Sequence, residues 1–472
     1  MQKQLNLFLG LLLFLTLGLW GNNSLPLELS KRIDHYPLNG EHYSIYIQAV
    51  NDPTPLASWQ ADTKRVPASV VKLLTTYAAL LGLGYDYRWE TKFFHTGYIR
   101  KGVLRGDLIV KASGDPTLKT ADLDDIVTQL RAKGIRKILG NIVIDRTIFK
   151  VPSRNSSGFD KNIYSPYNAM PDALMFNERK STICVTTTGK HVKIRRDIPD
   201  WSYKVVNKIR PVNGSCRKGR SWPKVSIKEQ GSESIITLSG KLSRRCGKRT
   251  ICKVVTKPYK SFYYALKDEM KKRGIGFKGT LKLRKTPKKA KYLFSHFSPP
   301  LEEVIATIAK KSNNLMARQL LLTLGTKHYA LPSTTFKGRK AIEKILGRYG
   351  IVEPNSVFVA NGSGLSRKSR LTARVLAKLL IHAEKNYGLR WRKTLSIAGI
   401  DGTIKRRFRN STVYGRAWMK TGTIKHVANI AGYVEGASGE LYVVVVLVND
   451  KRSAQYGRKL ANSVIEWVAD NL

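Results

Sequence analysis

Ser69 and Lys72 are the first pair of residues in this chain whose types and spacing could support catalysis. Residues three apart lie on one face of a helix, so the lysine nitrogen can hydrogen-bond the serine hydroxyl. A serine hydroxyl is a weak nucleophile until a base removes its proton, and a lysine can do this when burial or nearby cations lower its pKa. The pair therefore predicts nucleophilic catalysis by Ser69.

The same S-x-x-K spacing occurs twice more, beginning at Ser215 and at Ser221. Both copies lie in a strongly basic stretch that contains Pro223 and lacks a following apolar run. A helical wall is not expected there. Ser69 is therefore the candidate nucleophile.

Ser312 and Asn314 form an S-x-N element. Ser312 can pass a proton between a lysine and a leaving amine, while the Asn314 amide can donate to a substrate carbonyl and accept from its N–H. Taken alone the element is weak, because the triplet at residues 153–155 matches it as well. Ser312 by itself would be interpreted as a helix N-cap.

Lys420, Thr421, Gly422 and Thr423 contain the only K-T-G element of the chain, just before or at the start of a predicted strand. A cation with two hydroxyls along a strand edge would clamp a substrate carboxylate, and Gly422 would allow an extended peptide to approach the backbone closely. A lone K-T-G would instead be interpreted as an ordinary strand start with a solvated lysine.

Proline placement and hydrophobic periodicity indicate the elements that must position these residues. A proline two residues before Ser69 and helix formers after it place the serine at a helix N-terminus, where the field favours negative charge developing on a substrate. Helical periodicity at residues 301–309 and 314–324 places Ser312 between two helices. Apolar patterns predict strands at residues 43–50, 57–60, 138–144, 234–238, 427–434 and 441–448, and an amphipathic helix at 454–468.

The three elements occur in the order S-x-x-K, S-x-N and K-T-G, the signature set of penicillin-binding proteins and serine β-lactamases. The chain resembles the class C low-molecular-mass penicillin-binding proteins, the D-alanyl-D-alanine carboxypeptidase/endopeptidase family S13 that includes the penicillin-binding protein 4 type. The long gap between Lys72 and Ser312 fits the extra domains that this family inserts between its first two motifs. Further resembling segments lie at residues 65–69, 113–118, 167–169, 298–301 and 361–367.

The resemblance implies an α/β (α+β) architecture. Its core would be a penicillin-binding transpeptidase/β-lactamase-like antiparallel sheet with helices on both faces. We expect a discontinuous peptidase domain at residues 25–92 and 293–472, and β-rich inserted domains, two in number, at residues 93–292. The implied activity is that of a serine DD-peptidase acting on peptidoglycan stem peptides and inhibited by β-lactams.

The resemblance also assigns roles to the motif residues. Ser69 would be acylated by the D-Ala-D-Ala stem, Lys72 would be the general base, and Ser312 with Asn314 would relay protons and position the peptide. The substrate carboxylate would be held by Lys420, Thr421 and Thr423, and the backbone N–H groups of Ser69 and Thr423 would form an oxyanion hole. Gly422, Arg367 and Tyr167 would contribute to substrate binding, with Arg367 in the pocket for the stem side chain.

Two positions depart from the family pattern. Asn162 stands where an Asp is frequent, with Asp160 two residues away, and Lys425 stands where a Gln is common. In the family, both positions are associated with recognition of the free end of diaminopimelate. A more basic pocket would suit a carboxylate better than an ammonium group.

The amino terminus has the outline of a secretory signal, expected to span residues 1–24. Lys3 precedes an uncharged Leu-rich run at residues 5–20, which is shorter than a bilayer-spanning helix, and a polar stretch follows at 21–24. We expect cleavage near that stretch and export to the periplasm or cell envelope of a bacterium; an uncleaved N-terminal anchor is the alternative.

Four cysteines lie in the middle of the chain, at Cys184, Cys216, Cys246 and Cys252. An oxidising compartment predicts two disulfides, for which three connectivities remain open, with Cys246 to Cys252 as the local expectation. A four-Cys zinc site is disfavoured by the uneven gaps and the lack of paired C-x-x-C elements. No metal or organic cofactor is expected.

The formal net charge of +50 indicates an anionic partner or habitat. Export favours anionic envelope polymers or a membrane surface over specific nucleic acid, and simple solvation of the charges is an equal alternative. Three other functions are alternatives to a serine DD-peptidase: a β-lactamase, a non-catalytic wall-binding or β-lactam-sensing homologue, and a basic polyanion-binding protein. The sequence leaves the oligomeric state open.

Overall fold

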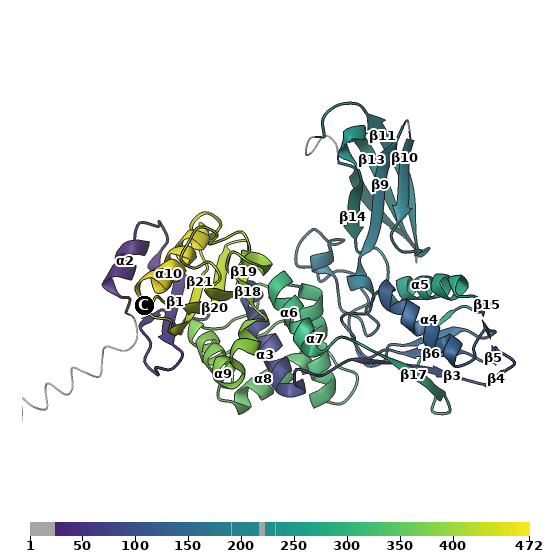
Figure 1. Ribbon diagram of the computed structural model, residues 1–472, viewed down its shortest axis with the longest axis horizontal. Coiled ribbons are helices and arrows are strands. Elements are labelled where there is room, and N and C mark those ends of the chain that lie inside the picture. Colours follow the sequence, from purple (N-terminus) through teal and green to yellow (C-terminus); the bar gives the residue numbers. More distant parts are fainter. Residues whose placement is uncertain (1–23, 190, 217–221, 232) are drawn as a thin grey trace, which may run out of the picture. The chain divides into compact units, whose positions relative to one another are not determined.

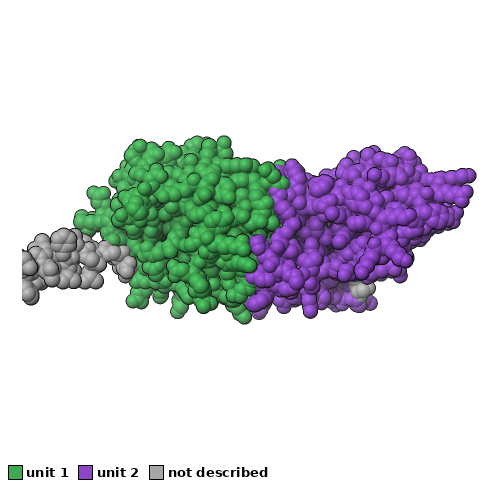
Figure 2. Space-filling view, turned by 90° about the horizontal axis from the view of Figure 1, so that it is seen from below, with its two compact units in different colours: residues 1–86, 301–324, 339–472 green, residues 87–300, 325–338 purple. Residues whose placement is uncertain are grey.

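A computed structural model describes residues 24–189, 191–216, 222–231 and 233–472 and divides into two compact units (Figures 1 and 2). Unit 1 comprises residues 1–86, 301–324 and 339–472, and unit 2 comprises residues 87–300 and 325–338. The expected signal segment lies outside the described residues apart from Ser24. No helix in the described part of the chain has the length and apolar character needed to cross a bilayer.

The core of unit 1 is a six-stranded antiparallel sheet in the order β18-β19-β20-β21-β1-β2 (Figure 1). Every residue of β1 is buried, because both faces of the sheet are covered by helices. The strands are β1 Tyr43–Ala49, β2 Ala57–Trp59, β18 Ser396–Ile397, β19 Ala417–Ile424, β20 Val427–Glu435 and β21 Leu441–Val448.

One face of this sheet packs against α2 and α10 in a single apolar core, and the other face packs against α9, whose Leu380 carbonyl accepts from the Tyr433 hydroxyl. The predicted antiparallel sheet with helices on both faces is thus confirmed. The helices that belong wholly or partly to unit 1 are α2 Leu27–Ile33, α3 Lys72–Leu83, α6 Leu301–Lys311, α7 Asn314–His328, α8 Thr335–Arg348, α9 Ala373–Arg392 and α10 Arg458–Asn471. Short helical turns are η1 Gly40–His42, η2 Ala68–Val71, η7 Gly402–Ile404 and the π-helical η8 Ser453–Gly457.

Unit 2 contains four sheets in the described residues, with strand orders β16-β8-β6-β3-β17, β15-β7-β5-β4, β10-β9-β14 and β11-β13-β12. The last two share one apolar core, to which β9 contributes Ile183 and β13 contributes Ile236. The strands are β3 Glu90–His95, β4 Tyr98–Arg100, β5 Val103–Arg105, β6 Leu108–Lys111, β7 Lys137–Ile138, β8 Ile142–Asp145, β9 Ser181–Thr188, β10 His191–Arg196, β11 Tyr203–Val212, β12 Lys224–Gln230, β13 Glu233–Ser243, β14 Arg249–Lys253, β15 Gly276–Phe277, β16 Leu281–Leu283 and β17 Lys291–Phe297.

Two helices, α4 Leu123–Ala132 and α5 Pro258–Lys272, pack against each other in unit 2 (Figure 1). The sequence pattern predicts only β-rich structure here, and the two helices correct that prediction: α4 buries the helical series Leu123, Ile126, Val127 and Leu130. The short helical turns of this unit are η3 Thr120–Asp122, η4 Pro166–Asn168, η5 Asn177–Arg179 and η6 Arg244–Cys246.

The strand predicted at residues 138–144 is wrong as a single element. β7 ends at Ile138 and β8 begins at Ile142, and the two strands belong to different sheets. A side chain at Gly140 would collide with the carbonyl oxygen of Gly106, so the chain turns at this glycine. Periodicity alone does not show such a close backbone approach.

The disulfide expectation is also wrong, both in the number of two and in the local pairing of Cys246 with Cys252. Cys246 pairs with Cys216, whereas Cys184 and Cys252 are free thiols. Cys246 packs into the core shared by the two three-stranded sheets, as does Ile251. Because side chains alternate along β14, Cys252 points to the opposite face of its sheet, where its sulfur lies 3.7 Å from the Thr182 hydroxyl.

Candidate active site

The Ser69 hydroxyl lies on a tight backbone turn, η2, directly before α3. Two asparagines, one on β20 and one directly after β21, hold this turn. The Asn429 side chain donates to the carbonyl oxygens of Val66 and Pro67, each at 2.9 Å, and the Asn449 amide oxygen accepts from the Val66 N–H at 2.7 Å. The serine is therefore anchored from β20 and from the segment after β21, not only by its own helix.

The Lys72 side chain contacts three other residues of the site. Its Nζ lies 2.8 Å from Ser69 Oγ, 2.8 Å from Asn314 Oδ1 and 2.5 Å from the carbonyl oxygen of Ser363. The side chain is completely buried. Burial first, and then the positive charges of Lys420 and Arg318, lower the pKa of Lys72 well below its usual value. A buried amine of this kind favours its neutral form, which can accept a proton.

Ser312 lies between α6 and α7 with a left-handed φ of 52°. The helix N-cap that its position suggested is instead Asn313, whose Oδ1 accepts from the N–H groups of Leu315 and Met316, each at 3.1 Å. The Ser312 hydroxyl accepts from Lys420 Nζ at 3.0 Å. Ser312 therefore serves the site and not the helix end.

Lys420 is the second buried lysine of the site, and its Nζ also donates to the Thr421 carbonyl oxygen at 2.7 Å. Burial lowers its pKa to about 7. Thr423 is exposed and Thr421 partly exposed, so their hydroxyls lie where a ligand can reach them. The Thr421 hydroxyl donates to Thr403 Oγ1 at 2.9 Å.

The K-T-G element was expected before or at the start of the strand at residues 427–434, and this position is wrong. It lies in the middle of a separate strand, β19, in which Gly422 pairs with Asn429 of β20. On the other side of β19, β18 pairs only with Trp418 and Met419. Among the described strands, none pairs with this edge of β19 from Lys420 onward, and an unpaired strand edge is the kind of site to which an extended peptide can add.

Position 422 requires glycine for a reason other than the expected approach of a substrate peptide. A Cβ at this position would lie 2.7 Å from the Pro67 carbonyl oxygen and 2.9 Å from the Ser69 nitrogen. The missing side chain therefore makes room for the chain's own serine turn.

We expect Gly422→Ala to push the Ser69 turn out of place and to slow acylation by penicillin at least about tenfold, since one misplaced reacting group can cost that much. The rate of adduct formation and the thermal unfolding temperature would be measured together. Gly347→Ala is the matched control, because its added methyl would lie 3.6 Å from the nearest atom outside its helix. Equal rates in both variants would contradict this explanation.

The segment at residues 361–367 contributes more than the expected Arg367. The Ser363 carbonyl oxygen accepts from Lys72, and a side chain at Gly364 would overlap the Ala68 carbonyl oxygen. Arg367 itself is exposed, and its guanidinium donates to the Lys425 carbonyl oxygen at 3.2 Å. The segment therefore packs against the serine turn and leads directly to Arg367.

Tyr167 lies in unit 2, within η4, and its hydroxyl donates to Asp160 Oδ2 at 2.7 Å. Asp160 also accepts from the Asn162 N–H at 2.9 Å and from Asn168 Nδ2 at 3.1 Å. The other predicted site residues all belong to unit 1. The part of Tyr167 in substrate binding stays a prediction.

Several residues of the site carry no motif: Asn429, Asn449, Ser363, Arg318 and Thr403. One of them had a usable signal, because Asn429 is a polar residue inside an otherwise apolar strand, where a buried amide must find partners. Ser363 lies in the resembling segment at residues 361–367, although it contacts Lys72 through its backbone oxygen. Asn449, Arg318 and Thr403 act through interactions between separate segments of the chain, which leave no local pattern in the sequence.

The sequence matches the D-Ala-D-Ala carboxypeptidase 3 (S13) family over residues 25–471. The chain belongs to this family. It is 27% identical over 417 residues to D-alanyl-D-alanine carboxypeptidase DacB of Haemophilus influenzae, covering 87% of this chain and 86% of that protein. The prediction of a serine-type D-Ala-D-Ala carboxypeptidase is confirmed at the level of the family.

Two solved structures of one similar protein show the same fold. The crystal structure of penicillin-binding protein 4 from Haemophilus influenzae superposes with a TM-score of 0.77 at 26% identity, covering 93% of this chain and 99% of the other. The same protein in complex with a β-lactam gives a TM-score of 0.74 at 25% identity, with the same coverage of 93% and 99%.

Proposed function

We propose that this S13 member is a serine DD-peptidase that hydrolyses D-alanyl-D-alanine stems of peptidoglycan through an acyl-enzyme on Ser69. One observation carries the proposal: a completely buried lysine, whose pKa is lowered by burial, lies 2.8 Å from the Ser69 hydroxyl. The family membership supports the substrate class. The β-lactam complex of the Haemophilus influenzae relative supports inhibition by the same class of compound.

The three oxygens around Lys72 Nζ determine where the hydrogens and the lone pair of the neutral amine are directed. A carbonyl oxygen and an amide oxygen can only accept, so Ser363 and Asn314 take two hydrogens of the amine. Of the three oxygens only Ser69 Oγ carries a proton to give. A neutral Lys72 thus keeps its lone pair directed at the serine hydroxyl, as a general base requires.

The reaction follows from this arrangement. Lys72 takes the Ser69 proton as Oγ attacks the carbonyl of the penultimate D-alanine, and the N–H groups of Ser69 and Thr423 stabilise the oxyanion. Ser312, hydrogen-bonded to Lys420, passes its proton to the leaving amine and regains one from the Lys72 ammonium, so that the terminal D-alanine departs and Lys72 is neutral again. Water then hydrolyses the ester on Ser69. A β-lactam would acylate Ser69 by the same first step.

Lys420, Thr421 and Thr423 are assigned to the substrate carboxylate. The ammonium is buried beside two hydroxyls on an open strand edge, the setting in which a charge-assisted hydrogen bond is strongest. Arg367 and Lys425 lie side by side, which favours a stem whose third residue offers a carboxylate. We further propose export to the bacterial envelope, where the net charge of +50 would favour anionic polymers.

The test follows release of D-alanine from a stem pentapeptide at pH values below and above 7. Release is expected, and kcat/KM should fall on acidification because Lys72 becomes protonated. It should also fall above about pH 7, because Lys420 then loses the charge that holds the carboxylate. A cross-linked stem dimer assayed in parallel would separate carboxypeptidase from endopeptidase action.

Lys420→Arg is the matched variant, since a guanidinium stays protonated throughout this range. It should keep the acid limb of the profile and lose the alkaline limb. An unchanged alkaline limb would show that Lys420 is not the group that titrates. No release of D-alanine by the folded wild-type protein would favour the non-catalytic wall-binding alternative.

A further inference from the structure

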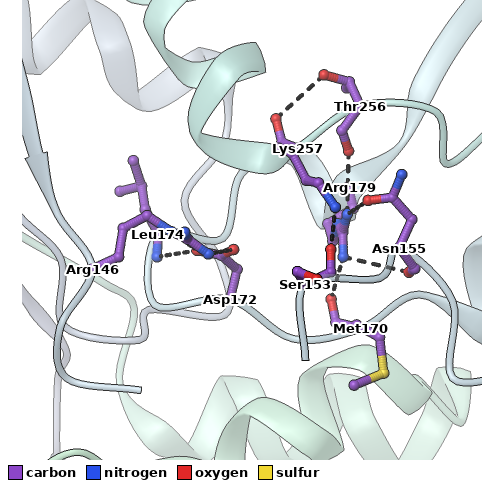
Figure 3. A network of polar contacts seen from close by, with 9 residues as sticks. All are labelled: Arg146, Ser153, Asn155, Met170, Asp172, Leu174, Arg179, Thr256 and Lys257. Atoms are coloured by element: carbon purple, nitrogen blue, oxygen red, sulfur yellow. Dashed lines mark hydrogen bonds and ion pairs between the residues drawn. The ribbon is translucent and has the colours of Figure 1, made fainter. Parts of the chain in front are cut away.

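A second cluster of charged residues lies in unit 2 around Arg179 (Figure 3). Residues 177–179 all have left-handed φ angles, of 47°, 50° and 58°, which residues other than glycine rarely adopt in succession. This turn brings the Arg179 side chain into the interior, where only 4% of the residue is exposed. The fold thus buries this arginine even though the backbone conformation of residues 177–179 is unfavourable.

The hydrogen bonds of the Arg179 guanidinium go to uncharged oxygens (Figure 3). It donates to the carbonyl oxygens of Met170 at 2.8 Å and Thr256 at 3.2 Å, and to Asn155 Oδ1 at 2.5 Å and Asn155 O at 3.4 Å. These bonds tie three segments together but do not neutralise the charge. Burial lowers the pKa of Arg179 to about 10, which still leaves it cationic at neutral pH.

One carboxylate, Asp172, lies near this charge, and it is already engaged by another arginine (Figure 3). Arg146 Nε donates to Asp172 Oδ1 at 2.9 Å, and its NH2 group donates to Oδ2. Lys257, which donates to the Ser153 carbonyl oxygen, adds a further positive charge beside Arg179. The Glu229 charge also acts on Lys257, but Arg146, Arg179 and Lys257 still outnumber the two carboxylates.

A cavity of about 140 Å³ is lined by these groups. Its charged lining consists of four basic side chains, Arg146, Arg154, Arg179 and Lys257, and of the Asp172 carboxylate. Its size suits a carboxylate or a phosphate group. The hydrogen bonds by which Arg179 joins three segments do not account for the additional positive charges of Arg154 and Lys257 on the same cavity. An anionic ligand does account for them.

A larger cavity of about 620 Å³ adjoins it and shares the lining residues Ser153, Arg154, Lys257 and Tyr259. It adds the apolar surfaces of Ile163 and Tyr164 and the carboxylates of Glu229 and Glu233. Glu233 is already paired with Lys204, whose Nζ lies 3.1 Å from Glu233 Oε2. The pair of cavities therefore offers cations, aromatic and aliphatic surface, and the Glu229 carboxylate, which can meet an ammonium group. A short peptide with carboxylate and ammonium groups has the matching chemistry.

We propose that these joined cavities form a second peptide-binding site, in which the basic cluster holds a carboxylate of a peptidoglycan stem. The choice of a stem peptide as ligand rests on the proposed function. The residues of this site are separate from Ser69, Lys72 and Lys420. Unit 2 would thus bind wall peptide in addition to the peptide being hydrolysed.

The experiment uses the full chain after acylation by penicillin, so that the catalytic serine is occupied. A stem tetrapeptide with free carboxylates is titrated by calorimetry, beside the same peptide with its carboxylates amidated and beside inorganic phosphate. We expect binding of the free peptide and a loss of at least about tenfold on amidation, the range for a lost charge-assisted hydrogen bond. Phosphate is expected to bind far more weakly than the peptide.

Lys257→Met and Arg154→Gln should each weaken peptide binding about tenfold, and both leave the buried Arg179 contacts in place. Lys208→Met removes an exposed charge on β11 outside both cavities and should leave binding unchanged. Thermal unfolding would show that the variants fold. Equal binding of the amidated peptide, an equal loss in Lys208→Met, or binding of phosphate without peptide would overturn the proposal.

The two proposals fail separately. If penicillin does not acylate the protein, the proposed catalytic function fails, and the same titration on the unmodified chain still tests the cavities. If acylation occurs but the acylated chain binds no peptide, only the second site is overturned.

Discussion

Replacing Ser69 with alanine is expected to abolish the covalent adduct that wild-type protein forms with penicillin, and to reduce release of D-alanine by at least about 10,000-fold. The reason is chemical: the Lys72 amine lies 2.8 Å from this hydroxyl, and without the oxygen there is no atom to acylate. Intact-mass measurement before and after incubation with penicillin would detect a single adduct on the wild-type protein and none on the variant.

Ser215→Ala is the matched control, because Ser215 begins another S-x-x-K sequence in this chain. Ser215 belongs to unit 2, and its variant should acquire the adduct as fully as the wild type. An adduct that persists in Ser69→Ala would show that another residue is the nucleophile. Absence of any adduct on folded wild-type protein would move the assignment to a β-lactam-insensitive wall-binding homologue.

Replacing Lys72 with methionine should slow acylation by penicillin by at least about 1,000-fold, the contribution of a general base at the upper part of its usual range. The variant should nevertheless fold. Lys72 is completely buried beside two other cations, and a methionine of similar length removes a group that is costly to bury when charged. Rates of adduct formation and thermal unfolding would be measured on the same samples.

Lys72→Arg separates the two roles that a lysine could have here. A guanidinium keeps a positive charge but does not accept a proton at neutral pH, so a general-base role predicts that this variant is as slow as Lys72→Met. Lys64→Met removes an exposed lysine from the segment just before the site and should react at the wild-type rate. Wild-type rates in Lys72→Arg would show that Lys72 contributes only charge.

Much of the catalytic core could be predicted because its signals are local. The S-x-x-K pair lies within one helical turn, and a proline with an apolar run marks the helix that follows. The strands at residues 43–50, 427–434 and 441–448 alternate or run apolar, and β1, β20 and β21 lie there within one residue at each end. The order of the three motifs then indicated the family.

Other features depended on pairing between distant segments. The sequence pattern places the K-T-G element just before or at the start of a strand, whereas pairing with β20 keeps residues 417–424 extended on both sides of the element. Cys246 pairs with Cys216 rather than with Cys252, which is nearer to it in sequence, because alternation along β14 turns Cys252 away from the shared core.

By itself, the sequence determined which residue types are available for catalysis and which local elements carry them, since helix starts and apolar periodicity act over a few residues. The tertiary structure decided how they meet. It buries Lys72 and Lys420, which lowers the pKa of each, and it brings Asn314 and Ser363 to the Lys72 nitrogen across hundreds of residues. Desolvation and hydrogen-bond geometry arise only when distant segments pack together, so no local pattern records them.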